Sequence, residues 1–306
     1  MASNIRHLLA SKDLKSEEVD FLLKFAIKLK DKPRRILEDR QLALLFEKPS
    51  LRTRVSFQVA MRQLGGETTY LAPQEVGLGE REAIKDVARV LSRYLDIVAV
   101  RTFAQEIIEE FARFSAVPVI NALTNEEHPC QALADLLTLH ERFGDLKNFP
   151  LAFVGDGNNV AASLIVTAAS LGLDIRLATP KGYRPSEAVL KEASTRASEN
   201  GGKFTLTESP EEAAAGVQAI YTDTWISMGQ EREAEQRRID FANYQLNKNL
   251  LASADPSVLI MHDLPAHRGE EITDEVFESE NSIIFDQAEN RTWAQAAVVA
   301  FLLDVI

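Results

Sequence analysis

Short apolar runs alternate with helix-forming segments along most of the chain, and this alternation limits the possible fold more than any other feature. Runs such as LALLF at residues 42–46 and LAFV at residues 151–154 have the length of buried strands. Segments with apolar residues at helical spacing lie between such runs. Strands and helices in this order predict an α/β architecture with parallel sheets.

The predicted elements fall into two series along the chain. Strands are predicted at residues 42–46, 97–100 and 117–120 in the first series, and at residues 151–154, 175–178, 204–206, 219–221 and 258–261 in the second. One predicted helix is capped by Ser16 and has its apolar residues at a 3.6-residue period, namely Val19, Leu22, Leu23, Ala26 and Leu29. Further helices are predicted to end near Leu64 and Leu171, to cover residues 84–91 and 129–143, and to close the chain at residues 290–305.

A stretch with Gly and Pro at residues 144–150 separates the two series. We therefore expect two doubly wound parallel-sheet domains joined by interdomain helices, which 306 residues are enough to build. The expected domains are residues 1–144, with a C-terminal helix at 290–306 packing back on them, and residues 150–287. Such folds bind ligands at the C-terminal ends of strands, so the active site is expected in the cleft between the domains.

Charge and cysteine content exclude several classes of function. The net charge of −12 argues against a nucleic-acid or membrane partner, because both favour a basic face. A single cysteine, Cys130, cannot form an intrachain disulfide or a cysteine-rich zinc site. The N-terminal segment has no apolar core of signal-peptide length, and no run approaches a membrane span, so a cytoplasmic protein is expected.

Residues 50–54, SLRTR, directly follow the predicted strand 42–46 and open a helix. The N-terminus of a helix offers free N–H groups and a positive dipole end, which suit a phosphate. Two hydroxyl groups and two arginines add donors, and an arginine can bind two phosphate oxygens at once. Taken alone, the pattern is equally typical of a capped helix start with solvated arginines.

Five further segments match one enzyme family in the order in which that family carries them. They are Arg101 after the strand 97–100, HPCQ at 128–131, DTWISMG at 223–229, MHDLP at 261–265 and ENR at 289–291. Together with FEKPSLRTRVSF at 46–57, they resemble the motifs of the ornithine carbamoyltransferase family. The matches span the chain nearly end to end. The resemblance therefore favours the phosphate-binding interpretation of residues 50–54 over the capped helix alone.

The resemblance implies transfer of the carbamoyl group of carbamoyl phosphate to an amine, without a metal or an organic cofactor. It implies that carbamoyl phosphate is bound by Ser50, Leu51, Arg52, Thr53, Arg101, His128, Gln131, Leu264 and Arg291. It implies that ornithine is bound by Asn158, Asn159, Asp223, Ser227 and Met228. The residues expected to act in catalysis are Arg52, Arg101, His128 and Asp263. The family also implies a homotrimer with active sites at subunit interfaces.

Four positions depart from the family pattern. Leu51 replaces a usual Thr, Gly77 a Gln that reaches a neighbouring subunit's site, and Trp293 a His. Asp263 replaces the family cysteine beside the attacking amine. A carboxylate there can hold the amine as ammonium and raise its pKa, or it can accept the amine proton as a base. The residues leave both effects open.

Three other interpretations follow from the residues. A carbamoyltransferase for a modified ornithine, lysine or a diamine keeps the fold and changes the acceptor. A catalytically impaired homologue would bind carbamoyl phosphate without turnover. A dinucleotide-binding enzyme is disfavoured, because GDGNN at 155–159 is followed by Val160 instead of the third glycine of that motif, and the next strand ends without an acidic residue.

Overall fold

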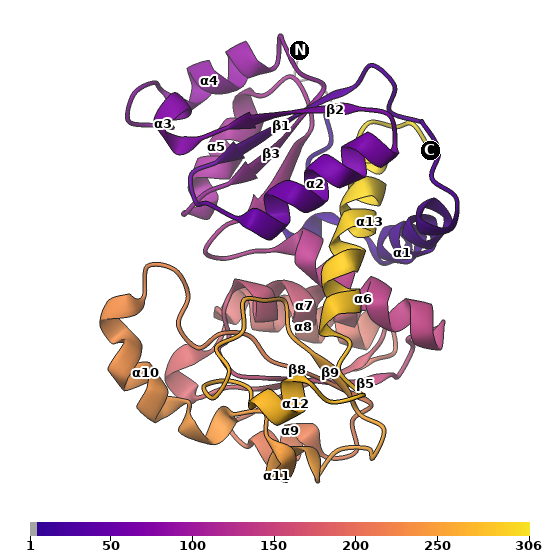
Figure 1. Cartoon of the computed structure of the whole chain (residues 1–306), viewed down its shortest axis with the longest axis vertical. Coiled ribbons are helices and arrows are strands. Elements are labelled where there is room, and N and C mark those ends of the chain that lie inside the picture. The colour runs from indigo at the N-terminus through magenta and orange to yellow at the C-terminus, as the bar shows by residue number, and fades with distance from the viewer. Residues whose placement is uncertain (1–4) are drawn as a thin grey trace. The chain divides into compact units, whose positions relative to one another are not determined.

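A computed structural model describes residues 5–306, which form two compact units (Figure 1). Unit 1 comprises the chain up to Leu137 together with Glu289–Ile306, and unit 2 is Thr138–Ala288. The boundaries fall inside two helices, α6 (Pro129–Phe143) and α13 (Ile284–Leu302), so each of these helices contributes residues to both units. Among the residues described, no helix has both the length and the apolar character needed to cross a membrane.

Unit 1 contains a parallel sheet of four strands in the order β2-β1-β3-β4. The strands are β1 (Gln41–Phe46), β2 (Glu67–Leu71), β3 (Ile97–Arg101) and β4 (Val119–Leu123). The helices assigned wholly to unit 1 are η1 (Ser11–Asp13), α1 (Ser16–Asp31), α2 (Leu51–Gln63), α3 (Pro73–Val76), α4 (Ile84–Leu91) and α5 (Gln105–Phe114). The strand order reverses direction between β1 and β3, which places the segments that follow these strands at a topological switch point.

Apolar residues of the central strands form the core on one face of this sheet. Ala43 and Leu45 of β1 and Val98 and Val100 of β3 pack with buried side chains of α4 and α5. Each of these four residues is almost completely shielded from solvent. Burying a residue of the size of Val or Leu contributes about 1.5–3 kcal/mol, so this layer fixes the ends of β1 and β3 firmly.

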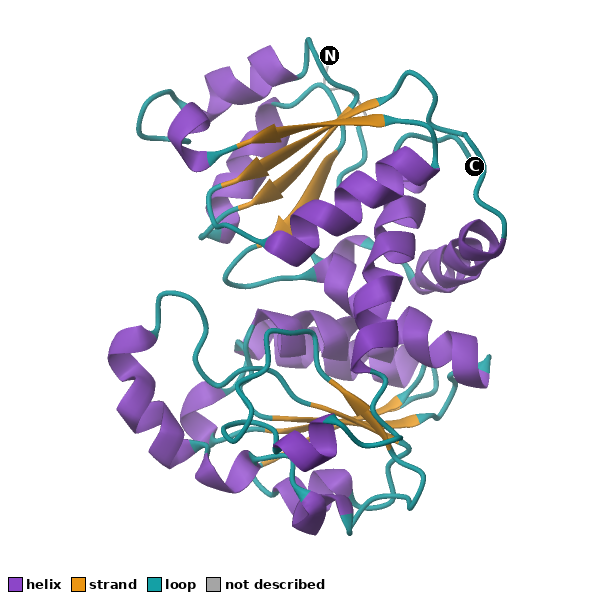
Figure 2. Cartoon of the chain, viewed as in Figure 1, coloured by secondary structure: helices purple, strands orange, loops and turns teal. Residues whose placement is uncertain are grey.

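Unit 2 contains a parallel sheet of five strands in the order β7-β6-β5-β8-β9. The strands are β5 (Pro150–Val154), β6 (Asp174–Ala178), β7 (Lys203–Thr207), β8 (Ala219–Tyr221) and β9 (Leu259–Met261). The helices assigned wholly to unit 2 are α7 (Asn159–Ser170), η2 (Lys181–Tyr183), α8 (Glu187–Glu199), α9 (Pro210–Ala214), η3 (Glu231–Glu233), α10 (Ala234–Asp240), η4 (Ala242–Tyr244), α11 (Lys248–Leu251) and α12 (Asp274–Phe277). Figure 2 shows helices surrounding the strands of each sheet. Here the strand order reverses between β5 and β8.

The α/β fold class with two parallel sheets is confirmed, and each predicted strand is present. The prediction of the first helix cap was wrong. Ser16 is the first residue of α1, while Lys15 is the cap, and its N–H is bound by the carboxylate of Glu18 at 2.8 Å. A carboxylate three residues into the helix thus takes the place of a capping hydroxyl.

Two other boundaries differ from the sequence prediction. Strand β2 was missed, because its five residues are half-buried or exposed and form no apolar run. Helix α13 begins at Ile284, not at residue 290. Its first turns carry polar side chains that are buried, Gln287 and Asn290, so the amphipathic pattern there does not indicate a helix.

Candidate active site

The N-terminus of α2 lies at the switch point of unit 1, directly after β1. Ser50 caps the helix: its hydroxyl accepts the N–H of Thr53 at 3.3 Å and donates to the hydroxyl of Thr53 at 3.0 Å. The end of β1 is tied to that of β3, because the N–H of Glu47 donates to the carbonyl of Arg101 at 2.8 Å. The capped helix start is therefore real, and it presents its free N–H groups beside Arg101.

Arg291 of α13 joins the start of α2 to α6 through its guanidinium group. Nη2 donates to Thr53 Oγ1 at 2.6 Å, and Nη1 donates to Gln131 Oε1 at 2.7 Å. The Gln131 amide is itself oriented, because its Nε2 donates to Asp135 Oδ1 at 2.7 Å. All four side chains are buried. The structure thus brings together three residues that the sequence assigned to carbamoyl phosphate, and adds Asp135.

One further buried cation, Arg101, and a neutral histidine, His128, complete this group. Arg101 ends β3, and His128 lies just before α6; both side chains are more than nine-tenths buried. Burial, with the charges of Arg291 and Arg101, lowers the pKa of His128 well below its usual value of 6.5. His128 is therefore neutral at physiological pH and offers one N–H donor. Burial also raises the pKa of the neighbouring Cys130 thiol to about 12, which makes it unreactive.

The remaining predicted residues of unit 1 are more exposed. Leu51 leaves 77% of its side chain in solvent and contributes its backbone only, while Arg52 is half-buried. The guanidinium of Arg54 lies over the ring of Tyr70, at 3.8 Å from the centroid. Gly77 adopts a positive φ of 54° as the residue that ends α3, where a side chain would be strained.

Sequence reasoning missed Lys48, which lies between β1 and α2 and is 95% buried, with 5% of its surface exposed. Its ammonium group donates to Asn125 Oδ1 at 2.6 Å. Burial, with the charge of Arg101, lowers the pKa of Lys48. A lysine between a predicted buried strand and a helix start could have been chosen as a candidate site residue from the sequence. Its contact with Asn125 could not be predicted, because the fold brings together two residues that are far apart in the sequence.

The switch point of unit 2 holds a second polar group. The Asn158 side chain caps α7 by accepting the N–H groups of Val160 and Ala161, and its Nδ2 donates to Asp223 Oδ2 at 2.7 Å. Asp223 follows β8 and is 95% buried, with 5% of its surface exposed. Its other oxygen accepts the N–H of Thr224 at 2.6 Å. Hydrogen bonds thus hold the Asp223 carboxylate in place at the C-terminal end of β8, beside the start of α7.

The three other residues predicted for the amino acid lie near this pair. Asn159 is the first residue of α7, and its Oδ1 accepts the N–H of Val160 at 3.0 Å. Ser227 and Met228 lie in the loop after β8; the Ser227 N–H donates to Gln230 Oε1 at 3.0 Å, and the Met228 side chain is exposed. The loop after β8 thus carries a fixed carboxylate, Asp223, whose charge suits an ammonium group.

A buried ion pair holds the base of the same loop. Arg237 of α10 donates through Nη1 to Asp156 Oδ2 at 2.8 Å and to the carbonyl of Trp225 at 2.9 Å. Burial raises the pKa of Asp156 to about 6, although the charge of Arg237 partly offsets the effect. Sequence reasoning placed Asp156 only in a glycine-rich turn and did not identify Arg237, since their pairing joins segments 81 residues apart.

The glycine-rich turn at 155–159 is explained by packing. A Cβ atom on Gly157 would lie 2.4 Å from the carbonyl oxygen of Tyr183 and 2.8 Å from the nitrogen of Pro185. The N–H of Gly157 donates to that same carbonyl at 2.9 Å. Glycine is therefore required by the close approach of the chain at residues 183–185. This observation supports the rejection of a dinucleotide-binding motif.

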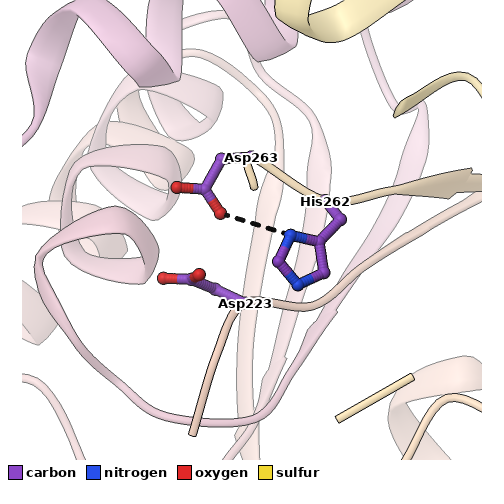
Figure 3. Close-up of side chains that lie close together, drawn as sticks. All are labelled: Asp223, His262 and Asp263. Atoms are coloured by element: carbon purple, nitrogen blue, oxygen red, sulfur yellow. Dashed lines mark ion pairs between the residues drawn. The ribbon is translucent and has the colours of Figure 1, made fainter. Parts of the chain in front are cut away.

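Asp223, His262 and Asp263 lie close together at the ends of β8 and β9 (Figure 3). One ligand atom from each lies within 4.8 Å of the others, and Asp263 Oδ1 is 3.7 Å from His262 Nδ1. His262 Nδ1, however, accepts the N–H of Leu264 at 2.9 Å. Its lone pair is therefore already used, which argues against a metal bound through this nitrogen.

Comparison with known proteins adds to this geometry. The family model described as the aspartate/ornithine carbamoyltransferase carbamoyl-P binding domain matches residues 6–141. The one described as the Asp/Orn binding domain of the same enzymes matches residues 147–302. The chain belongs to the aspartate/ornithine carbamoyltransferase family.

Relatives with curated names share about half of their residues with this carbamoyltransferase chain. The ornithine carbamoyltransferase of Pyrococcus abyssi is 50% identical over 303 residues, covering 97% of the chain and 96% of the relative. That of Archaeoglobus fulgidus is 50% identical over 304 residues, covering 98% of each. The solved ornithine carbamoyltransferase of Pyrococcus furiosus is 48% identical and superposes with a TM-score of 0.95 over 100% of the chain and 99% of that structure. The fold is therefore that of this carbamoyltransferase family over its full length.

Proposed function

We propose that the protein transfers the carbamoyl group of carbamoyl phosphate to the side-chain amine of L-ornithine, giving L-citrulline and phosphate. The observation that carries this proposal is the pair of hydrogen bonds that Arg291 donates, one to Thr53 and one to Gln131. They are made beside buried Arg101 and neutral His128. These residues would supply a phosphate site and oxyanion donors within one unit. Full-length relatives named ornithine carbamoyltransferase support the choice of acceptor.

The phosphate group would bind at the start of α2. Ser50, Arg52 and Thr53, with the backbone N–H groups of residues 51 and 52, would hold its oxygens, and Arg291 would take part through its planar fork. The helix dipole stabilises the negative charge that the phosphate carries as it leaves. No metal or organic cofactor is part of the proposal.

Donors for the carbamoyl group would come from Arg101 and His128. As the amine nitrogen attacks the carbonyl carbon, negative charge grows on the carbonyl oxygen, and these two residues with Thr53 would stabilise it. His128 can do so as a neutral donor, because its pKa lies well below its usual value. The bond from carbon to the phosphate oxygen then breaks, and the departing phosphate takes up the proton that the amine nitrogen loses. Gln131 would hold the carbamoyl amide. The sequence resemblance also assigns Leu264 to carbamoyl phosphate.

The amino acid would bind in unit 2. Asp223 would pair with the α-ammonium group, while Asn158 or Asn159 and the N–H groups near Ser227 and Met228 would bind the α-carboxylate. Asp223 is suited to this role because Asn158 and the N–H of Thr224 fix its two oxygens. Recognition of both charged ends favours ornithine over a plain diamine.

Asp263 supports a second candidate acceptor. It is buried close to Asp223 and His262, and it adds a carboxylate where the family carries a cysteine. A second anionic group there changes the charge beside the acceptor amine, which keeps a modified ornithine, lysine or a diamine open as the acceptor. A carbamoyl-phosphate-binding homologue without turnover is the third alternative.

One assay separates these candidates. Purified protein would be incubated with carbamoyl phosphate and ornithine, lysine, N-modified ornithine or putrescine, with both phosphate release and carbamoylated product measured. Citrulline formation fastest with ornithine is the expected result. Faster turnover of another amine would identify that amine as the acceptor in place of ornithine. Binding of carbamoyl phosphate without phosphate release for any amine would identify an impaired homologue.

The cellular role and assembly are proposed on the same basis. A relative from Pyrococcus furiosus is named an anabolic ornithine carbamoyltransferase, which supports a place in arginine biosynthesis. We further propose a cytoplasmic location. We expect a homotrimer, with neither nucleic acid nor membrane as a partner. Light scattering should then give about three times the chain mass of 34.0 kDa.

A further inference from the structure

Glu271 lies in unit 2, is completely buried, and is none of the residues assigned to either substrate. Its Oε1 accepts two hydrogen bonds, one from the N–H of His267 at 2.5 Å and one shared with His262 Nε2 at 3.1 Å. Burying a carboxylate is costly unless donors surround it. The free-energy cost of burying Glu271 must therefore be offset by its hydrogen bonds, and one of these is with the imidazole of His262.

The contact determines which nitrogen of His262 carries the proton. A carboxylate can only accept, so Nε2 must be the donor toward Glu271. On the other side of the ring, the N–H of Leu264 donates to Nδ1 at 2.9 Å, so Nδ1 must be the acceptor. Both contacts agree on a neutral imidazole with its hydrogen on Nε2. The 3.7 Å approach of Asp263 Oδ1 to Nδ1 is then a contact with a neutral ring, not an ion pair.

The same contacts hold the backbone of the MHDLP segment. Leu264 has a positive φ of 64°, an unusual conformation for a residue with a side chain. Its N–H is fixed by His262 Nδ1, and the N–H of His262 itself donates to Gln287 Oε1 at 2.9 Å. A proton on Nδ1 would point at the N–H of Leu264, and the segment would have to move.

We propose that Glu271 is a positioning residue that holds His262 as the Nε2–H tautomer and thereby fixes Leu264 and Asp263 for the reaction. The inference rests on the proposed function only for the roles of Leu264 and Asp263. The tautomer itself is a property of the protein without substrate. Glu271 touches neither substrate, and it acts through the histidine ring.

The test uses the full chain labelled with ¹⁵N in its histidines, of which there are five. Nitrogen chemical shifts distinguish the two neutral tautomers and the imidazolium, and His262→Asn assigns the His262 signals by their loss. The variants are Glu271→Met, which removes the acceptor at similar size, and Glu271→Gln, whose carbonyl can still accept. Glu192→Gln is the matched control, since Glu192 lies in α8 and is paired with Arg196.

We expect the Nε2–H tautomer in the unmodified protein, in Glu271→Gln and in the control. In Glu271→Met, we expect loss of that signal and a kcat about tenfold or more lower, as for the loss of a hydrogen bond to a charged group. Glu271→Gln should recover most of the activity. An Nδ1–H tautomer or an imidazolium in the unmodified protein would overturn the proposal, as would an unchanged tautomer in Glu271→Met.

Failure of the proposed function would look different. A protein that shows the expected tautomer and its dependence on Glu271, yet carbamoylates no amine, would retain the positioning role and lose only the activity assigned to the site. If Glu271→Met does not fold, the tautomer of the unmodified protein and of Glu271→Gln still decides the proposal. A Glu271→Gln variant whose His262 signals match the Nδ1–H form would contradict it.

Discussion

Arg291 Nη2 donates to Thr53 Oγ1 at 2.6 Å, although 238 residues separate the two in the sequence. The second arm of the same guanidinium reaches Gln131 across 160 residues. One arginine thus fixes the hydroxyl at the start of α2 and an amide of α6 at once. Because its fork is planar and rigid, the relative position of these two groups is set by a single side chain.

Replacing Arg291 with Lys should impair binding of carbamoyl phosphate. An ammonium group on a flexible stem cannot hold two acceptors in a fixed planar geometry. We expect the KM for carbamoyl phosphate to rise about 10- to 100-fold, the equivalent of one charged hydrogen bond. Steady-state kinetics at saturating amine measure this. Arg89→Lys, at an exposed ion pair with Asp86, is the control, and an unchanged KM in Arg291→Lys would contradict the assigned role.

Asp135 should control the orientation of the Gln131 amide. Its carboxylate accepts from Gln131 Nε2 at 2.7 Å, which turns the Gln131 oxygen toward Arg291. In Asp135→Leu, the amide can rotate and present its NH₂ group to the guanidinium, so two donors would face each other. We expect the KM for carbamoyl phosphate to rise by about tenfold and stability to fall by about 1–3 kcal/mol.

Asp135→Asn provides the graded comparison, because its carbonyl can still accept the Gln131 amide proton. It should retain more activity than Asp135→Leu. Urea unfolding measures stability and initial rates measure KM, with Asp86→Asn on the surface as the control. Equal kinetics for Asp135→Leu and the unmodified protein would show that Gln131 keeps its orientation without Asp135.

His128 should contribute no ionisation to the pH profile near neutrality. Burial, with the charges of Arg291 and Arg101, lowers its pKa well below 6.5, so it is already neutral. We expect kcat/KM for carbamoyl phosphate to show no His128 step between about pH 6 and pH 9. His128→Gln should lower the rate by about 100-fold through loss of an oxyanion donor and leave the shape of the profile unchanged. An acidic limb that disappears only in His128→Gln would refute this.

Short apolar runs in the sequence predicted the strands well, because most strands are such runs and few of these runs also fit the spacing of a helix. β1 and β3, for example, are fully buried along nearly their whole length. β2 could not be found in this way, since its polar residues are only partly buried and its pairing with β1 depends on the sheet that is already formed. A five-residue stretch of sequence does not show whether its residues will be buried by pairing with a neighbouring strand.

The candidate site was predicted by ordered motifs more than by local physics. The helix start at Ser50 and the switch-point loops follow from the α/β order, so their place in each unit could be expected. The contacts that fix the side chains could not be predicted from the sequence. The Arg237–Asp156 pair and the Glu271–His262 contact depend on turns and helix packing that bring together residues with no shared periodicity.

Asp156 should make the protein less stable as pH rises through its titration. Its pKa in the folded protein is raised from 3.8 to about 6, so the folded state binds the proton more tightly than the unfolded state. The resulting stability is present below about pH 4 and is lost as pH rises to about 6, by about 3 kcal/mol in total. Asp156→Asn cannot ionise and should lack this loss.

The measurement is the free energy of unfolding in urea at intervals between about pH 4 and pH 7, for the unmodified protein and Asp156→Asn. The difference between the two should change in favour of the variant as pH rises. Asp86→Asn, at an exposed carboxylate, is the control for general charge effects. Parallel pH dependences for the unmodified protein and Asp156→Asn would rule out this titration.

Asp263→Cys should increase activity toward ornithine at neutral pH. The carboxylate lies close to Asp223, and a second negative charge beside an acceptor amine favours its ammonium form, which cannot attack. Removing that charge should shift the rising limb of kcat/KM for ornithine to lower pH by about one unit. Asp263→Asn keeps the size and removes the charge, so it should shift the limb in the same direction. If Asp263 instead accepts the amine proton, both variants should lose about 10²- to 10⁴-fold in rate. An unchanged pH limb and an unchanged preference across the amine panel in both variants would show that Asp263 does not tune the acceptor.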